Sequence, residues 1–250
     1  MKLAKSILKK FTPFFQNSSF FLQGQMDINP KSRWNNASLR SETGGFYPKG
    51  DESKRQIKNL EPWDNTRRDM ITLMLRTLIE KKVEGAFAEL GVYKGNTARL
   101  IHHYAPERQL HLFDTFEGFT DRSVSAEKGH TDFDTKGSKF SDTSIPQVKK
   151  YISPQNDNIT FHQGYFPDSL PDDFPEQKFA FVHLDADLYE PTLEGLKYFY
   201  SRMSTKGIIL VHDYNAWIGA RKAVDDFFAD KEEMPVPMPD KSGSALIIKQ

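Results

Sequence analysis

From residue 86 onward the chain alternates short apolar segments with amphipathic ones, and this alternation constrains its fold more than any other feature. Strand-like apolar segments occur at residues 86–90, 109–113, 159–162, 178–184, 208–211 and 244–249. Helical spacing of apolar residues occurs at residues 64–81, 96–101, 146–152, 192–203 and 221–228. Strands that alternate with helices pair in parallel through right-handed crossovers. The sequence therefore predicts an α/β fold with a doubly wound, mostly parallel sheet and helices on both faces.

The predicted domain begins near residue 62 and runs to residue 250. Residues 179–184 and 208–211 are almost continuously apolar, as strands covered on both faces require. We find no internal repeat and no second apolar core, so a single domain is expected at residues 62–250. Residues 120–144 are polar and too long for an ordinary connection, which indicates a mobile lid rather than a structural element.

Composition excludes several classes of protein. The 34 basic and 34 acidic residues cancel, so the chain lacks the positive charge of a protein that binds nucleic acid along its length. With 38% hydrophobic and 27% charged residues, the chain is typical of a globular protein rather than a disordered one. It has no cysteine, which excludes disulfides, thiolate nucleophiles and iron–sulfur clusters. We expect a cytoplasmic protein.

Residues 1–61 are predicted to form a basic amphipathic helix followed by an irregular arm. Apolar residues within 1–22 recur at helical spacing, but lysines and Pro13 interrupt them. A signal peptide needs an unbroken apolar stretch of about 7–15 residues and a bilayer span needs about 20, so neither is expected. Two alternatives stay open: weak contact with a membrane surface or a partner, or an arm that packs on its own domain or across a homo-oligomer. We favour the second.

Polar residues gather at the predicted strand ends, where open α/β sheets bind their ligands. These residues are Glu89 with Gly91 and Gly95, Asp114, Gly164, Asp185 with Asp187, and His212 with Asp213. A strand end needs only one turn residue, so acids at four of five ends exceed what turn formation requires. The carboxyl ends of the strands are therefore the predicted functional site.

The first strand ends in a glycine turn with the pattern E-x-G-x-x-x-G from Glu89 to Gly95. Glycines allow close approach of a ligand, and the following helix offers free N–H groups to an anion. Glu89 would repel a pyrophosphate, so the turn suits a ligand with an ammonium and a carboxylate, such as the methionyl end of S-adenosylmethionine. Asp114 is placed to accept two ribose hydroxyls and Phe116 to cover an adenine. The alternatives are a plain tight turn and an Asp that caps the next turn.

The residues that follow the predicted strands at 178–184 and 208–211 suggest a metal-binding or catalytic site. If their strands are neighbours, Asp185, His212 and Asp213 meet in an oxygen and nitrogen site suited to Mg²⁺, Mn²⁺ or Fe²⁺. Such an ion would orient a substrate hydroxyl and lower its pKa. Alternatively, Asp185 and Asp213 cap helices and His212 is a buried, hydrogen-bonded core residue. Asp187 and His212 are the other candidates for a general base.

Five motifs in this order resemble the macrocin O-methyltransferase family. They are Ala88–Gly95, Phe113–Phe119, Gly164–Pro171, Leu184–Glu190 and Val211–Tyr214, and the resemblance covers about residues 62–230. It implies a seven-stranded, Rossmann-like class I methyltransferase fold, S-adenosylmethionine as cofactor and bound Mg²⁺. It also implies methylation of a sugar hydroxyl on a glycosylated metabolite. Asp185 matches the family's acidic metal ligand, whereas His212 replaces the first Asp of an Asp–Asp pair.

These inferences combine into one functional hypothesis, an O-methyltransferase acting on a sugar or glycoside. The expected cofactor-binding residues are Glu89, Gly91, Val92, Tyr93, Gly95, Asn96, Thr97, Asp114, Thr115, Phe116, Gly164 and Tyr165. The expected catalytic residues are Asp185, His212 and Asp187, and the expected metal ligands are Asp185, His212 and Asp213. The alternatives are a metal-independent methyltransferase that uses His212 or Asp187 as base, a non-catalytic cofactor-binding scaffold, and a short-chain dehydrogenase, whose Y-x-x-x-K pair is not apparent.

Overall fold

The computed structural model describes residues 64–130, 140–152, 158–174 and 176–250. The helix and arm predicted at residues 1–61 lie outside the described residues. All described residues belong to the unit Asn59–Gln250, which forms an α/β domain.

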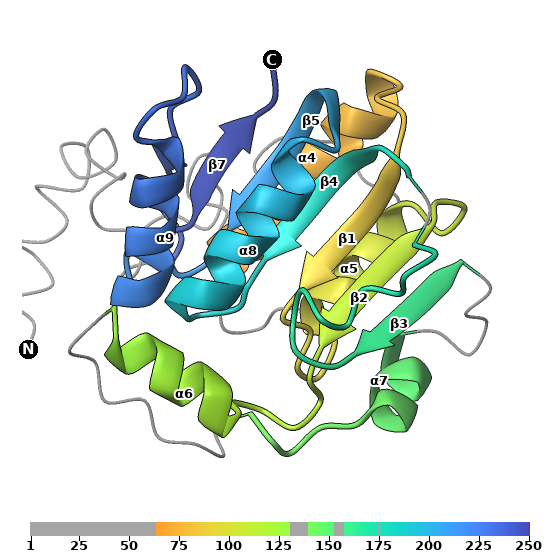
Figure 1. Ribbon diagram of the computed structural model, residues 1–250. Helices are drawn as coiled ribbons and strands as arrows, with labels where there is room; N and C mark the ends of the chain where they lie inside the picture. Colours follow the sequence, from red (N-terminus) through yellow and green to blue (C-terminus); the bar gives the residue numbers. More distant parts are fainter. Residues whose placement is uncertain (1–63, 131–139, 153–157, 175) are drawn as a thin grey trace, which may run out of the picture. The chain divides into compact units, whose positions relative to one another are not determined.

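The domain is built on one seven-stranded sheet with the order β3-β2-β1-β4-β5-β7-β6 (Figure 1). The strands are β1 Ala86–Leu90, β2 Leu110–Asp114, β3 Ile159–Gln163, β4 Phe179–Leu184, β5 Met203–Val211, β6 Val236–Pro237 and β7 Ala245–Ile248. Strands β1 to β5 pair in parallel, whereas β7 runs antiparallel to both β5 and β6. This arrangement confirms the predicted mostly parallel, doubly wound sheet.

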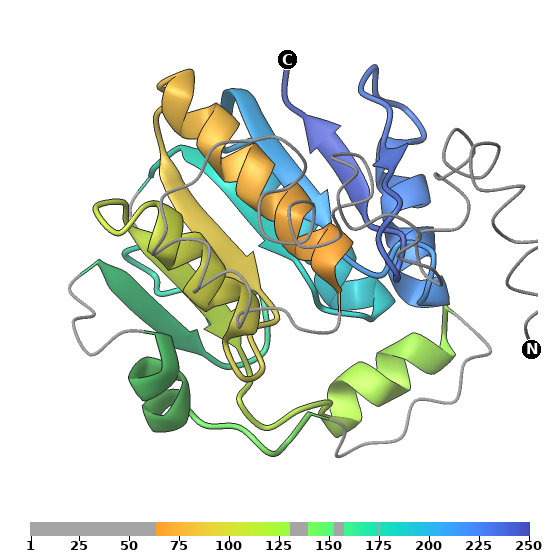
Figure 2. The ribbon, with the colours of Figure 1, turned by 180° about the vertical axis from the view of Figure 1, so that it is seen from behind.

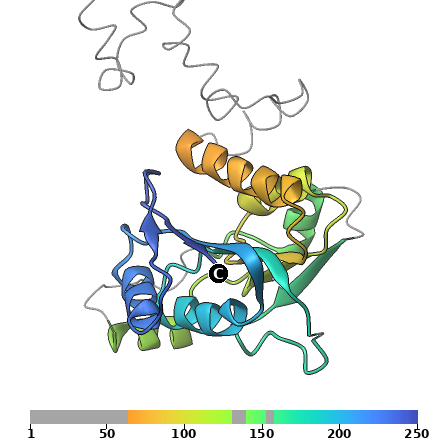
Figure 3. The ribbon, with the colours of Figure 1, turned by 90° about the horizontal axis from the view of Figure 1, so that it is seen from above.

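Helices cover both faces of the sheet. They are α4 Asn65–Glu80, α5 Asn96–Tyr104, α6 Asp121–Lys128, α7 Ile145–Ile152, α8 Tyr189–Tyr200 and α9 Ile218–Phe228. Helices α4, α5 and α7 lie on one face, and α8 and α9 lie on the other with α6 beside them (Figures 2 and 3). Within the described residues, no helix is long and apolar enough to cross a membrane.

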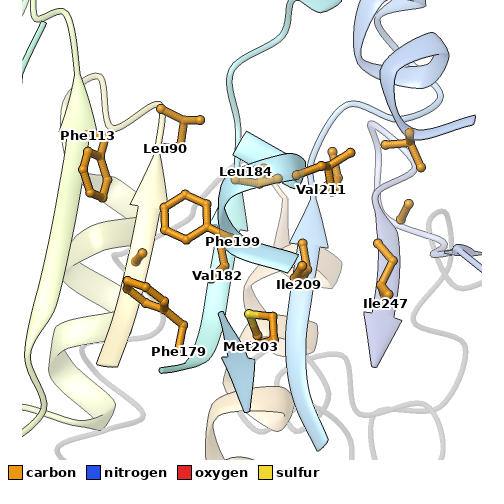
Figure 4. Close-up of a cluster of buried hydrophobic side chains, with 14 of the residues drawn as sticks. Leu90, Phe113, Phe179, Val182, Leu184, Phe199, Met203, Ile209, Val211 and Ile247 are labelled. Carbon is orange, nitrogen blue, oxygen red and sulfur yellow. The ribbon is translucent and has the colours of Figure 1, made fainter. Parts of the chain in front are cut away.

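The core explains why the central strands are so apolar. Every residue of β1 and β4 is buried, because each strand lies between two helical layers. Phe199 of α8 packs with its ring centroid 5.1 Å from that of Phe179 and 5.8 Å from that of Phe113 (Figure 4). Truncating a buried side chain of this size to alanine costs about 3–5 kcal/mol, so this layer fixes the sheet that carries the polar strand ends.

One segment differs from its sequence-based expectation. Residues 120–144 were expected to form a lid without regular structure, but residues Asp121–Lys128 form helix α6. The Thr120 side chain caps this helix by accepting a hydrogen bond from the Ser123 N–H. At its other end, buried Glu127 accepts a hydrogen bond from the Tyr189 N–H at the start of α8, at 2.8 Å. A long-range contact therefore stabilises a helix that the polar sequence of this segment did not predict. The mobility of the segment stays a prediction.

Candidate active site

A cavity of about 300 Å³ lies at the carboxyl ends of the parallel strands. Its volume is at the lower limit for pockets that bind small molecules. Fourteen predicted site residues line it: Glu89, Gly91, Val92, Tyr93, Asn96, Thr97, Asp114, Thr115, Gly164, Tyr165, Asp185, Asp187, His212 and Asp213. Two predicted residues, Gly95 and Phe116, are absent from the lining.

The glycine turn after β1 lies against the end of β4. Gly91 has φ +88°, and a Cβ atom there would lie 2.6 Å from the carbonyl carbon of Asp185. The Asp185 N–H in turn donates to the Leu90 carbonyl oxygen at 2.7 Å. Only glycine fits this position, since any side chain would push the two strand ends apart. The predicted cofactor turn and the predicted catalytic acid are therefore neighbours in the structure.

Gly95 has a structural role in this arrangement. It precedes α5 in a left-handed conformation, and a Cβ atom there would lie 2.8 Å from a methyl group of Val148 on α7. Its small size thus allows α5 and α7 to pack closely. No side chain caps the first turn of α5, and its residues Asn96 and Thr97 line the cavity.

Asp114 organises the turn as well as facing the cavity. Its Oδ2 accepts hydrogen bonds from the N–H groups of Val92 and Tyr93, at 2.7 and 2.8 Å, and its Oδ1 accepts one from the Phe116 N–H at 2.6 Å. A carboxylate can accept about four hydrogen bonds. Asp114 therefore holds the turn, as the turn-capping alternative expected, and about one acceptor position is left for a ligand rather than the two that a pair of ribose hydroxyls would use.

Of the two aromatic residues expected on the cofactor side, Tyr165 lines the cavity and Phe116 does not. Phe116 is buried outside the cavity lining, with its ring centroid 6.1 Å from that of Phe161. Tyr165 does line the cavity, and its hydroxyl donates to Glu190 at 2.9 Å. Arg122 of α6 stacks on the Tyr165 ring with its guanidinium carbon 4.0 Å from the centroid.

The acidic ends of β4 and β5 converge as predicted. His212 Nδ1 lies 2.8 Å from Asp185 Oδ1 and 3.0 Å from Asp213 Oδ2. Asp187 and Asp213 both adopt left-handed backbone conformations, with φ +60° and +58°, which aspartate tolerates better than most residues. These four residues line the cavity, so the structure brings together every residue predicted as catalytic or metal-binding.

Charge interactions shift the pKa values of the residues in this cluster in different directions. Burial alone lowers the pKa of His212, but Asp185 and Asp213 outweigh it and raise that pKa to about 10. Burial alone raises the pKa of Asp185, but His212 and Arg67 outweigh it and lower that pKa. Burial together with Asp185 and Asp213 raises the pKa of Asp187 well above its usual range. Without a bound ion, His212 is therefore a proton donor, and Asp187 is the most basic carboxylate of the cluster.

The same cluster fits a small divalent cation. One ligand atom each from Asp185, His212 and Asp213 lies within 4.8 Å of the others, which makes this trio a candidate metal site among the described residues. Two carboxylates and an imidazole are ligands that Mg²⁺, Mn²⁺ and Fe²⁺ accept. An ion there would have to replace the proton of His212 Nδ1, on which both carboxylates converge.

Arg67 is a site residue that sequence analysis missed. Its Nη2 donates to Asp185 Oδ2 at 2.6 Å and to Thr97 Oγ1 at 3.2 Å. The predicted helix at residues 64–81 gave no signal that its first turn reaches the strand ends. That placement depends on how α4 packs across the sheet, which residue spacing does not encode.

An aromatic cluster lies at one side of the cavity. It consists of Tyr93, Phe119, Phe140 and Trp217, and we call it the aromatic wall. Ring centroids are 5.1 Å apart for Tyr93 and Phe140, 5.4 Å for Phe119 and Phe140, and 5.8 Å for Phe119 and Trp217. The first three residues line the cavity. The wall comes from separate segments, so its assembly could not be foreseen from any one motif.

Comparison with known proteins identifies the family. A family model described as Macrocin-O-methyltransferase (TylF) matches residues 64–245. The chain belongs to the macrocin O-methyltransferase family. This confirms the resemblance that its five motifs indicated.

Three similar proteins illustrate this macrocin O-methyltransferase relationship. A Streptomyces olivaceus 8-demethyl-8-(2,3-dimethoxy-alpha-L-rhamnosyl)-tetracenomycin-C 4'-O-methyltransferase is 29% identical over 172 residues, which span 64% of each chain. A Streptomyces niveus demethyldecarbamoylnovobiocin O-methyltransferase is 27% identical over 204 residues, 76% of this chain and 72% of that protein. The structure of the O-methyltransferase NovP superposes with a TM-score of 0.60 at 21% identity, covering 92% of this chain and 95% of that one. This last likeness shows the shared class I fold.

Proposed function

We propose that the protein transfers the methyl group of S-adenosylmethionine to a hydroxyl of a sugar or glycoside. The observation that carries this proposal is the backbone contact between Gly91 and Asp185. It joins a turn suited to the methionyl part of the cofactor to an acidic cluster suited to a hydroxyl, inside one cavity. Membership in the macrocin O-methyltransferase family supports the same activity.

The cofactor side of the cavity offers groups for each part of S-adenosylmethionine. The N–H groups at the start of α5, beside Thr97, suit the methionyl carboxylate, and Glu89 suits the ammonium. The acceptor position left on Asp114 suits a ribose hydroxyl. Tyr165 and Gly164 frame the adenine side. These are the residues that would hold the cofactor in this chain.

The acceptor side combines the aromatic wall with the acidic cluster. Aromatic side chains pack against the apolar face of a sugar ring, while a few placed polar groups bond its hydroxyls. The name of the Streptomyces olivaceus relative specifies a 4'-O-methylation on a rhamnosyl compound. We therefore propose a deoxysugar or related glycoside as the acceptor class.

Asp187 is our candidate for the general base because it lines the cavity beside Asp185 and Asp213, and in its ionised form it would be the most basic carboxylate of the cluster. Its raised pKa makes it a stronger base than an ordinary carboxylate, whereas His212 already holds a proton at neutral pH. In the proposed step the acceptor oxygen gains the methyl group as the carbon–sulfur bond breaks, and the hydroxyl proton passes to Asp187. The products are a methyl ether, a proton on Asp187 and S-adenosylhomocysteine.

We propose that a divalent ion assists this step, held by Asp185, His212 and Asp213. Bound there, it would orient the acceptor hydroxyl and lower the pKa of that hydroxyl. The alternative is metal-independent transfer, in which protonated His212 donates a hydrogen bond to the acceptor. Activity that persists after treatment with EDTA would favour this alternative.

The experiment that tests the function is an assay on a panel of nucleotide sugars and glycosides. Purified protein is incubated with S-adenosylmethionine, and mass spectrometry follows both S-adenosylhomocysteine and a product heavier by one methylene. The expected result is equal amounts of both products with at least one sugar acceptor. Binding of S-adenosylhomocysteine without transfer to any acceptor would instead point to the non-catalytic scaffold.

A further inference from the structure

We propose that Arg67 is a positioning residue that fixes the orientation of the Asp185 carboxylate, an inference that rests on the proposed function. Arg67 Nη2 donates to Asp185 Oδ2 at 2.6 Å, and His212 Nδ1 donates to Asp185 Oδ1 at 2.8 Å. Each oxygen of the carboxylate thus has its own cationic partner. Rotation of the carboxylate would break both interactions, so its orientation is set from two sides.

The Arg67 side chain also contacts residues of the cofactor side. The same Nη2 lies 3.2 Å from Thr97 Oγ1 on α5 and 3.3 Å from His183 Nε2 on β4. His183 Nδ1 lies 2.9 Å from Glu89 Oε1, so His183 donates to Glu89 and can accept from Arg67. Burial holds the pKa of His183 well below its usual range, in agreement with this neutral form. One polar chain therefore runs from Glu89 through His183 and Arg67 to Asp185.

The backbone of Arg67 is held as firmly as its side chain. Asp64 caps α4, and its Oδ1 accepts the Arg67 N–H at 3.0 Å. The other oxygen of Asp64 accepts the Lys241 N–H at 2.9 Å. The Arg67 side chain is only 11% exposed. Because both the backbone and the buried guanidinium of Arg67 are held by hydrogen bonds, this residue suits a role in orienting a neighbour rather than in attracting a substrate from solution.

The consequence of removing Arg67 follows from these contacts. In Arg67→Ala, Asp185 keeps one partner and is free to turn about its side-chain bonds. Loss of a residue that orients a ligand or a catalytic group typically lowers activity about 10–100-fold. Cofactor affinity should change much less, because Asp114 and the start of α5 still face the cavity. We expect turnover and cofactor binding to respond separately.

The test compares Arg67→Ala and Arg67→Lys with Arg76→Ala. Arg76 lies on the same helix outside the cavity lining and pairs with Glu80, so its variant is the matched control. For each we would measure kcat, the acceptor KM and the Kd for S-adenosylhomocysteine. Arg67→Ala should lower kcat about 10–100-fold, with that Kd within about threefold of wild type. Added guanidinium ion should restore part of the lost turnover, Arg67→Lys should fall between, and Arg76→Ala should match wild type.

A second readout does not depend on activity. NMR of protein labelled with ¹⁵N-histidine reports the His212 Nδ1–H, which is bonded to Asp185. This resonance should shift in both Arg67 variants and stay in place in Arg76→Ala. If wild type transfers no methyl group, the proposed function fails, whereas the resonance shift still tests the positioning role. An unchanged resonance, or a loss of cofactor affinity equal to the loss of kcat, would overturn it.

Discussion

Gly91 and Asp185 meet backbone to backbone, so close that a Cβ atom on Gly91 would lie 2.6 Å from the Asp185 carbonyl carbon. The turn expected to hold the cofactor and the acid expected to face the acceptor therefore cannot move independently. Methyl transfer requires the two substrates to be aligned to within a fraction of an ångström. Under the proposed function, the packing of these two strand ends would set that alignment.

We therefore predict that Gly91→Ala impairs cofactor binding and turnover together. The side chain would force an unfavourable left-handed backbone, which costs about 1–3 kcal/mol, and would displace the Asp185 backbone. Calorimetric titration with S-adenosylhomocysteine should show weaker binding, and thermal unfolding should occur at a lower temperature. The control is Gly129→Ala, because Gly129 ends α6 in a right-handed conformation. Equal behaviour of the two variants would contradict the prediction.

Asp187→Asn should remove the proposed base while preserving the cavity. The amide keeps the shape of the side chain but cannot take the acceptor proton, so kcat should fall about 10²–10⁴-fold. The Kd for S-adenosylhomocysteine should stay close to that of wild type. Asp230→Asn is the control, since Asp230 is exposed and pairs with Lys231. Full activity of Asp187→Asn would exclude Asp187 as the base.

His212→Asp should strengthen magnesium binding. The substitution replaces an imidazole by an oxygen ligand that Mg²⁺ prefers and removes a positive charge from between two carboxylates. Titration with Mg²⁺ after treatment with EDTA should give a lower Kd for the variant than for wild type. If neither protein binds Mg²⁺ or Mn²⁺ and wild type stays active, the ion-assisted step is wrong and the metal-independent alternative holds.

A buried histidine pair leads us to predict that stability depends on pH. His111 Nδ1 lies 3.0 Å from His162 Nε2, and Gln177 Nε2 lies 2.7 Å from His111 Nε2. Burial and the neighbouring His162 lower the pKa of His111 to about 4, and burial lowers the pKa of His162. Below about pH 6.5 these two histidines bind protons in the unfolded chain. In the folded chain they stay neutral until the pH approaches their lowered pKa values.

The free energy of unfolding should therefore fall as the pH drops from about 6.5 to about 4, by about 1–3 kcal/mol for His111 alone. Urea denaturation at pH 7.5 and pH 5 measures this difference. His111→Gln should reduce the pH dependence, whatever it does to stability at pH 7.5. An undiminished pH dependence in this variant would assign the effect to other groups.

Local sequence patterns were enough to predict the strands and helices whose limits depend only on nearby residues. The strand at residues 86–90 matches β1 because its apolar run is bounded by Gly85 and Gly91. Helix α8 begins at Tyr189 rather than at the expected Thr192, and Glu127 of α6 accepts the Tyr189 N–H at this start. Tertiary contacts decided the start of this helix, which the spacing of apolar residues did not reveal.

The same distinction applies to the site. Most predicted residues follow strands directly, and parallel strands carry such residues to one edge of the sheet. Phe116 departs from its expected role because it is buried near Phe161, outside the cavity lining. Arg67 and Glu127 were missed because their partners are far away in sequence. Glu127 and Tyr189 are more than 60 residues apart, and Arg67 and Asp185 are more than 110 residues apart. No local pattern encodes such contacts.

Calorimetric titration of S-adenosylhomocysteine into wild type and Asp114→Ala tests the central claim most directly. Asp114 holds the turn, and the proposed function assigns its remaining acceptor position to the ribose. We predict one binding site per chain in wild type and clearly weaker binding in Asp114→Ala, whereas Asp185→Ala retains binding and loses turnover. If wild type shows neither heat of binding nor a thermal shift with this compound, the cavity is not a cofactor site and the account is wrong.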